Sequence, residues 1–281
     1  MGLKLEFRKH TLNFKFDAGT SRGVLKTKDA WIIKVFETEK PSVFGLGEVS
    51  VIERLSFDFQ LDFNHELELL AKRLANCEVP ESETEVYSLT KALVSVKHPA
   101  IRFGLETALL GLIHQEPFKI FDNDFVDGKK EIPINGLIWM GDEAFMKAQI
   151  DQKLRDGFRC IKLKIGAIDF EAECQMLAYI RSQYSAEVLT LRVDANGAFG
   201  TKDALAKLER LGAFDLHSIE QPIMPKQIQA MHQVCRDSKI PVALDEELIG
   251  VFDSKDKEQL LKEINPPFII LKPALLGGFH T

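Results

Sequence analysis

The feature that most constrains this chain is a charged residue that closes one apolar run after another in its second half. Five runs end in this way, at Lys164, Asp194, Glu220, Asp245 and Lys272. The intervals between these residues are 30, 26, 25 and 27. One strand and one helix of a (β/α) barrel together take about 31 residues. The intervals therefore predict one charge per strand–helix unit, at the carboxyl ends of neighbouring parallel strands, where barrel active sites are built.

The runs themselves have strand character, and amphipathic segments separate them. We predict strands at 132–139, 160–165, 189–194, 217–221, 241–245 and 268–272. Helices are expected between them, for example at 143–156, 170–183, 202–211 and 226–237. Alternation of this kind is typical of an α/β protein with a parallel sheet and helices packed outside it.

The first 118 residues have a different pattern. Alternating segments predict strands at 3–16, 29–36 and 43–51, with a small-residue loop at 17–23. Three helices should follow: one with Asn64 as its N-cap, one at 83–96, and one that begins at Pro99. We predict an α+β domain at 1–118, a polar linker at 119–131 and the barrel domain at 132–281.

Composition excludes several classes of protein. The net charge of −6 does not favour nucleic acid as a partner, because phosphate binding needs a basic surface. No apolar run reaches the roughly 20 residues that span a bilayer, so no membrane association is expected. Four scattered cysteines form no disulfide framework, which suits the cytoplasm. The oligomeric state is left open.

Several of the charged residues share a strand face. Lys162 and Lys164 are two apart, as are Arg192 and Asp194, so each pair points to one side of its strand. A single aspartate after a strand is often only a helix cap. Helix capping does not explain five charged residues at one regular interval, because two of them are lysines. A lysine in an apolar strand is costly unless it is paired or functional.

Carboxylates on neighbouring strands indicate a site for a hard cation. Asp194, Glu220 and Asp245 offer oxygen ligands of the kind that Mg²⁺ prefers, and Lys164 and Lys272 would offset the charge of a carboxylate substrate. A metal beside a substrate carboxylate favours removal of a proton from the adjacent carbon, because the resulting enediolate needs a preorganised cation. A lysine can serve as the base.

The motifs together resemble the enolase superfamily, in its muconate-lactonizing-enzyme subgroup. They are Lys162-x-Lys164, Asp194-Ala-Asn196, Glu220-Gln221-Pro222, Asp245-Glu246 and Lys272-Pro273. The resemblance implies a modified TIM-like (β/α)7β barrel with an N-terminal α+β capping domain. It implies Mg²⁺, or Mn²⁺, on Asp194, Glu220 and Asp245.

The resemblance also implies roles for other residues. Lys164 and Lys272 would be catalytic, with support from Lys162, Arg192, Asn196 and Glu246. A loop around Thr20, Ser21 and Arg22 would close over a small-molecule carboxylate substrate.

Within that subgroup, four peptides are similar to those of the o-succinylbenzoate synthase family: 45–48, 55–58, 102–106 and 135–141. That likeness implies a metal-dependent lyase that dehydrates a succinyl-hydroxycyclohexadiene-carboxylate in menaquinone biosynthesis. Lys164 would take the α-proton and return it to the departing hydroxyl. Two alternatives stay open: a dipeptide epimerase or N-acylamino acid racemase with the same two lysines, and a barrel without activity that acts as a binding protein.

The number of strands raises a question about length. Only six strands are predicted before the sequence ends at Thr281. A parallel sheet of six strands would leave two unpaired edges. We therefore expect a barrel truncated after its sixth strand, with two strands and about 60 residues missing at this repeat length.

Overall fold

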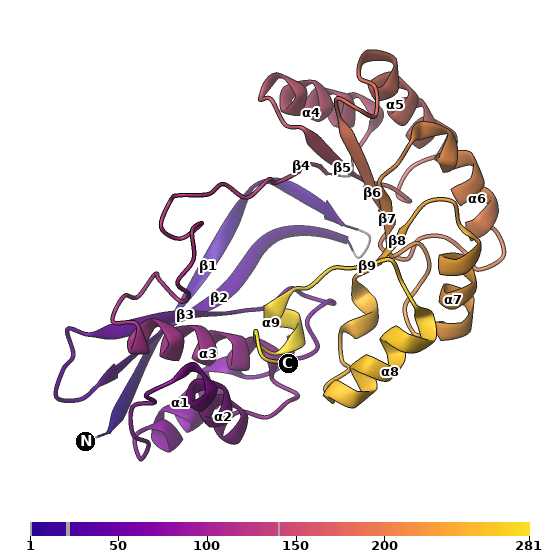
Figure 1. Cartoon of the computed structure of the whole chain (residues 1–281). Helices are drawn as coiled ribbons and strands as arrows, with labels where there is room; N and C mark the ends of the chain where they lie inside the picture. The colour runs from indigo at the N-terminus through magenta and orange to yellow at the C-terminus, as the bar shows by residue number, and fades with distance from the viewer. Residues whose placement is uncertain (1, 21–22, 140) are drawn as a thin grey trace.

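The computed structural model describes residues 2–20, 23–139 and 141–281 (Figure 1). It contains a three-stranded antiparallel sheet in the order β1-β2-β3 and a six-stranded parallel sheet in the order β4-β5-β6-β7-β8-β9. The first sheet and three helices form a cap domain. The second sheet and its helices confirm the predicted α/β architecture. None of the helices in the described ranges is long and apolar enough to cross a membrane.

The cap sheet begins with a long hairpin. Strand β1 covers Leu3–Thr20, β2 covers Gly23–Glu37 and β3 covers Phe44–Ser50. The loop expected at 17–23 is wrong in extent, since pairing continues to Thr20 and Gly23 after an irregularity between Asn13 and Ala18. Continued pairing gives the backbone groups of this polar segment partners that a loop would have to find in water.

Three helices complete the cap: the first and the third pack on its sheet, and the second packs on the third. They are α1 (Phe63–Leu74), α2 (Glu83–Leu93) and α3 (Pro99–Ile113). The N-cap of α1 is Asp62, whose side chain accepts from the backbone N–H of His65 at 3.2 Å. The expected cap, Asn64, was wrong, because its side-chain oxygen accepts instead from Trp31 Nε1 at 2.8 Å. The helix expected at 83–96 ends earlier, at Leu93.

Glycines allow α3 to lie directly on β3. A Cβ atom on Gly45 would stand 1.7 Å from the carbonyl oxygen of Ala108, and one on Gly47 would stand 1.9 Å from that of Gly104. These are backbone atoms that no side-chain rotation can move. The packing of α3 on β3 therefore requires glycine, which has no side chain, at both positions.

The parallel sheet follows the predicted spacing closely. Its strands are β4 (Gly136–Ile138), β5 (Cys160–Lys164), β6 (Thr190–Asp194), β7 (Ser218–Glu220), β8 (Val242–Leu244) and β9 (Phe268–Ile269). Its helices are α4 (Glu143–Arg155), α5 (Phe170–Gln183), α6 (Ala204–Leu211), α7 (Ile228–Asp237) and α8 (Ser254–Ile264), with 3₁₀ turns at Gly212–Phe214 and Glu246–Leu248.

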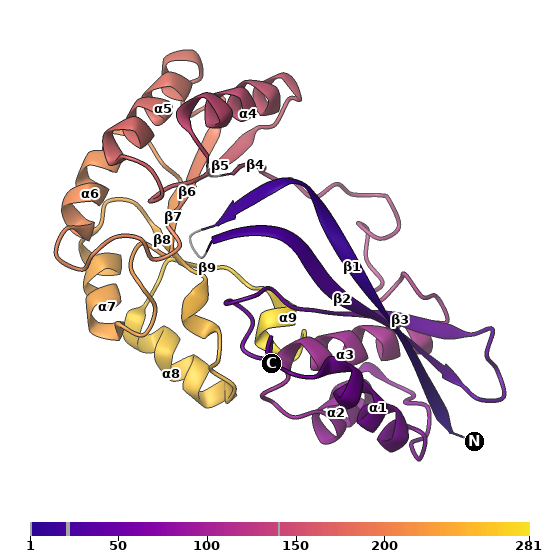
Figure 2. The ribbon, with the colours of Figure 1, turned by 180° about the vertical axis from the view of Figure 1, so that it is seen from behind.

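The parallel sheet curves, and its helices follow the outer side of the curve. Figure 2 shows this row from α4 to α8 from behind, with the end of β1 and the start of β2 near the barrel strands on the inner side. Within the described residues β9 pairs with β8, and no pairing joins β9 to β4. The expectation of further strands stays a prediction. The domain boundaries also stay a prediction. Helix α9 (Pro273–Leu276), which follows the parallel sheet in the sequence, packs on α3 of the cap.

The contact between β3 and α3 yields a test of the cap's packing. We expect Gly47→Ala to lower the free energy of unfolding by about 2 kcal/mol or more, because a forced methyl group must separate the strand from the helix. Gly212→Ala is the matched control, since its Cβ would meet no atom within 4 Å. Urea unfolding followed by circular dichroism measures both. Equal midpoints for the two variants would contradict the packing argument.

Candidate active site

The carboxyl ends of five adjacent strands carry the predicted charges. Strand register places Lys164 beside Asp194, and Asp194 beside Glu220. Asp245 follows β8 directly, and Lys272 lies three residues beyond β9. Because neighbouring parallel strands end at one edge, residues far apart in the sequence form a continuous row there.

Side-chain alternation explains which groups face inward. Ile161 and Leu163 of β5 are fully buried against the helix layer. Lys162 and Lys164 therefore point to the opposite, inner face, where their side chains are 16% and 14% exposed. These exposures are low for lysine, and each ammonium is compensated by carboxylates.

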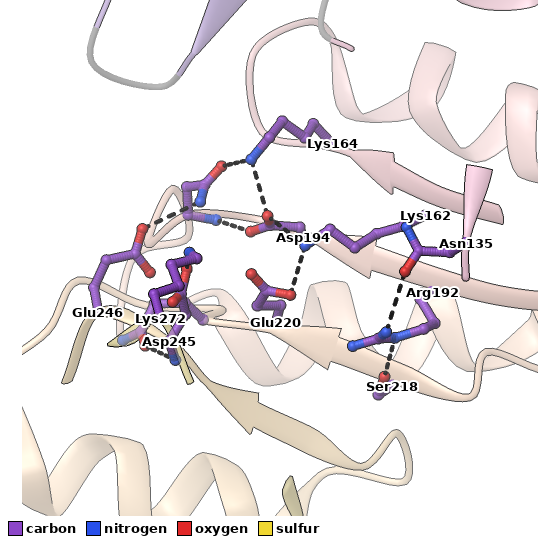
Figure 3. Close-up of polar contacts among 12 residues, drawn as sticks. Asn135, Lys162, Lys164, Arg192, Asp194, Ser218, Glu220, Asp245, Glu246 and Lys272 are labelled. Carbon is purple, nitrogen blue, oxygen red and sulfur yellow. Dashed lines mark hydrogen bonds and ion pairs between the residues drawn. The ribbon is translucent and has the colours of Figure 1, made fainter. Parts of the chain in front are cut away.

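Ion pairs connect the row (Figure 3). Lys162 Nζ lies 2.7 Å from Glu220 Oε2 and 3.2 Å from Asp194 Oδ2. Lys164 Nζ lies 2.9 Å from the same Asp194 oxygen. Lys272 donates to Asp245 Oδ2 at the other end. Two ammonium groups thus share one aspartate oxygen, while Asp245 has a lysine partner of its own.

The carboxylates differ in how well their charge is compensated. Burial favours the neutral form of Asp194, but Lys162 and Lys164 outweigh it and hold the pKa of Asp194 below its ordinary value. Burial, together with Asp194 and Asp245, raises the pKa of Glu220 to about 7 despite the hydrogen bond from Lys162. Glu220 is therefore the carboxylate with the least compensated negative charge.

This uncompensated charge suits an additional cation. Glu220 Oε1 is buried and has no hydrogen-bond partner among the described residues. In the same described part of the chain, no three His, Cys, Asp or Glu side chains lie close enough together to hold a metal ion. The ammonium group of Lys162 lies between Asp194 and Glu220 and pairs with both. The donor chemistry of Asp194, Glu220 and Asp245 fits Mg²⁺, whose ligands are oxygens.

Asn196 links the lysine on β5 to a carboxylate beyond β8. Its side-chain oxygen accepts from Lys164 Nζ at 2.7 Å, and its Nδ2 donates to Glu246 Oε1 at 3.1 Å. Its backbone N–H donates to Asp194 Oδ1 at 3.0 Å, and its φ is +44°. Asparagine tolerates this left-handed conformation better than most residues. Asn196 therefore orients Lys164 from a fixed turn.

Gln221 has a positional role that the sequence motif did not reveal. Its side chain is fully buried, and its oxygen accepts from the backbone N–H of Asp245 at 3.1 Å. Its amide nitrogen donates to the carbonyl oxygen of Ile223 at 3.0 Å. Gln221 thereby ties the end of β7 to the end of β8, next to two of the candidate ligands.

The structure places Arg192 apart from the row. Its guanidinium donates to Ser218 Oγ at 3.3 Å and to Asn135 Oδ1 at 3.5 Å (Figure 3). Arg192 does not belong to the side chains that line the cavity above the row. Its contacts join β6 to β7 and to the segment before β4.

A cavity of about 740 Å³ lies between the row and the cap. The barrel contributes Leu137, Trp139, Lys162, Lys164, Asp194, Asn196, Glu220, Glu246 and Lys272. The cap contributes residues from the hairpin and from the segment after β3, including Phe14, Leu25, Lys28, Asp29, Arg54, Leu55 and Phe59. Asp245 is not part of the lining and lies beside Lys272.

The expected substrate loop is described only in part. Thr20 ends β1, and Ser21 and Arg22 lie outside the described residues. The hairpin on both sides of this position supplies cavity residues, among them Phe14 and Val24. The sequence patterns did not single out these lining residues, because they belong to strands whose alternation shows two faces but not which face meets the barrel.

Known proteins share both the sequence and the fold. A family model described as "Enolase C-terminal domain-like" matches residues 145–279. The o-succinylbenzoate synthase of Desulfotalea psychrophila is 44% identical over 99% of this chain and 80% of its own length. The crystal structure of MenC from that organism has a TM-score of 0.81 and 40% identity, and the match covers 100% of this chain and 81% of that chain.

A more distant structure shares the fold alone. It is a dipeptide epimerase from Cytophaga hutchinsonii, solved with Mg and the dipeptide D-Ala-L-Val, with a TM-score of 0.79 and 21% identity over 99% of this chain and 74% of that chain. The 44% identity to the Desulfotalea relative, which extends over four fifths of that protein, is decisive for the family. The chain belongs to the enolase superfamily, in its muconate-lactonizing-enzyme-like subgroup.

Proposed function

We propose that this chain is a metal-dependent o-succinylbenzoate synthase, a lyase that removes water from a succinyl-hydroxycyclohexadiene-carboxylate in menaquinone biosynthesis. The observation that carries the proposal is one cavity lined by Lys164, Lys272 and the strand-end carboxylates, in a chain 44% identical to a protein of that name. Its four free cysteines suit the cytoplasm as its place of action.

Lys164 is the proposed base. Asp194 and Asn196 hold its nitrogen within the cavity, so its position is set before substrate binds. Once Lys164 has given up one proton of its ammonium group, its nitrogen takes the proton from the α-carbon of the substrate, and the electron pair of the C–H bond passes toward the carboxylate. The C–O bond to the hydroxyl group then breaks. The ammonium of Lys164 returns the proton to that hydroxyl, and water leaves.

Lys272 is the proposed fixed cation. It follows β9, which lies four strands from β5, so the two lysines reach the cavity from opposite ends of the row. Its side chain is 40% exposed and donates to the buried Asp245. A cation in this position stabilises the negative charge that develops on the substrate carboxylate.

Asp194, Glu220 and Asp245 are the proposed metal ligands. When bound, Mg²⁺, or Mn²⁺ in its place, would supply positive charge that stabilises the enediolate. Asn196 and Glu246 orient the groups around this point through the hydrogen bond that joins them. The aromatic and aliphatic lining, including Phe14, Leu25 and Trp139, limits the access of water.

An epimerase or racemase is the second candidate, because lysines at both ends of the row offer a proton donor and acceptor for two faces of one carbon. We expect rapid dehydration of the cyclohexadiene substrate, followed by absorbance, and slow α-deuterium exchange into dipeptides and N-acyl amino acids in D₂O. Rapid exchange into those compounds without dehydration would favour the second candidate. The complete absence of turnover with all of them would favour a binding protein.

The base assignment has a direct test. Lys164→Ala should lower kcat for dehydration by at least about 100-fold, because general acid–base groups contribute roughly 10²–10⁴-fold. Lys239→Ala is the matched control, since this lysine is 72% exposed and pairs with Glu209 on the surface. A coupled absorbance assay measures both. Undiminished turnover in Lys164→Ala would show that another group takes the proton.

The metal assignment is tested by binding as well as by activity. Glu220→Gln should weaken Mg²⁺ binding, measured by isothermal titration calorimetry, by at least about tenfold, because the loss even of outer-shell partners costs 10–100-fold. Chelation should abolish dehydration in the wild type, and Mg²⁺ should restore it. Glu209→Gln, at an exposed ion pair, should bind Mg²⁺ normally. Equal affinity in both variants would remove Glu220 from the ligand set.

A further inference from the structure

One buried carboxylate of the cap has no part in the mechanism above. Glu106 lies in the middle of α3, and it is 2% exposed. Its Oε1 accepts from the backbone N–H of Phe279, and the backbone of His280 also donates to this carboxylate. Burial raises the pKa of Glu106, and these amides and Arg102 oppose that shift. A group of the cap domain is thus bonded to a segment that follows the last strand of the barrel sheet.

Successive backbone hydrogen bonds connect that segment to Lys272. The carbonyl oxygen of Lys272 accepts from the N–H groups of Leu275 and Leu276, at 2.8 and 3.1 Å. The carbonyl oxygen of Pro273 accepts from those of Gly277 and Gly278, both at 2.9 Å. The next residue, Phe279, donates to Glu106. These hydrogen bonds constrain the backbone between Lys272 and the residue that contacts the cap.

The fit around Glu106 is close. Gly278 has a φ of +119°, and a Cβ atom on it would stand 2.3 Å from Glu106 Oε2. The ring of Phe279 packs edge-on against Phe103 and Phe121, with centroids 5.4 and 5.1 Å apart. Figures 1 and 2 both show α9 beside α3, away from the helices that cover the barrel sheet.

The barrel sheet holds Lys272 weakly by comparison. Strand β9 has two residues, Phe268 and Ile269, which are 42% and 40% exposed. Their partners are Ala243 and Leu244 of β8, and the backbone N–H of Ile270 makes one further bond to Leu244. These two paired residues do not by themselves fix a side chain three residues further along the chain.

We infer that Glu106 is a positioning residue, which holds the Lys272 segment in place from the cap domain. This inference rests on the proposed function where it gives Lys272 a catalytic role. The structural part, that Glu106 determines where Lys272 lies, does not depend on the identity of the substrate. The two parts therefore need separate measurements.

The first measurement is the reactivity of Lys272 toward an amine-acetylating reagent, followed by mass spectrometry. Lys272 donates to the buried Asp245. In Glu106→Ala the segment loses its anchor, and we expect Lys272 to be acetylated at least about threefold faster, while Lys239 on the surface reacts at an unchanged rate. Glu106→Gln keeps an acceptor oxygen for the Phe279 N–H, so it should restore most of the wild-type protection.

The second measurement is turnover. Glu106→Ala should lower kcat for dehydration by about 10- to 100-fold with a change in KM below about threefold, because displacing Lys272 weakens an interaction that strengthens as charge develops in the transition state. Leu74→Ala is the control, since it opens a cavity in the cap core on α1 and destabilises the cap without touching the segment. It should leave both readouts near wild type.

The outcomes are distinguishable. Faster acetylation and lower kcat in Glu106→Ala, with rescue by Glu106→Gln, support the inference. Wild-type acetylation in Glu106→Ala overturns it, as does an equal effect of Leu74→Ala. If the wild-type enzyme shows no dehydration, or if Lys272→Ala is fully active, the proposed function or the role of Lys272 fails, while acetylation still decides whether Glu106 holds the segment.

Discussion

The site depends on one constraint, the in-register pairing of parallel strands that sets Lys164, Asp194 and Glu220 side by side. A row of carboxylates at that edge would be repulsive by itself, and each is only 2% exposed. The lysines of β5 make the row possible, because they supply positive charge from the same face of the sheet. Their charge is insufficient for Glu220, whose pKa remains at about 7. The fold thus concentrates negative charge where a divalent cation and a carboxylate substrate would meet.

The cap completes this arrangement from the other side. Close packing of α3 on the glycines of β3 gives the cap a rigid layer, and the long β1–β2 hairpin extends from that layer to the strand ends. The cavity has walls from both parts, with charges below and mainly apolar side chains such as Phe14 and Leu25 above. The proposed metal ligands and the proposed base therefore all come from the barrel, whereas the cap lines the opposite side of the cavity.

Much of this could be predicted from the sequence because the relevant signals are local and repeated. The apolar runs located β5 to β8 within a residue or two, and alternation gave the common face of Lys162 and Lys164. The features that could not be predicted depend on tertiary contacts. Asn64 has the character of a cap residue, yet its side-chain oxygen accepts a hydrogen bond from Trp31, which lies 33 positions away in the sequence. Strand β9 is shorter than its apolar run, because strand length depends on pairing with β8. No local pattern shows that Glu106, in an apolar helix, bonds to a backbone 173 residues away.

Buried carboxylates also explain how the loops at the strand ends are held. Glu173 of α5 accepts from the backbone N–H groups of Gly166 and Ile168, at 2.6 and 3.5 Å, in the loop after Lys164. Glu247 accepts from the backbone N–H of Lys226 at 2.9 Å, in the loop after Glu220. These anchors belong to the barrel, so the loops after Lys164 and Glu220 are held by the domain that carries these two residues. The corresponding anchor after Lys272 is Glu106, which belongs to the cap. Because the segment after Lys272 is bonded to the cap, the cap helps to hold one end of the charged row as well as covering it.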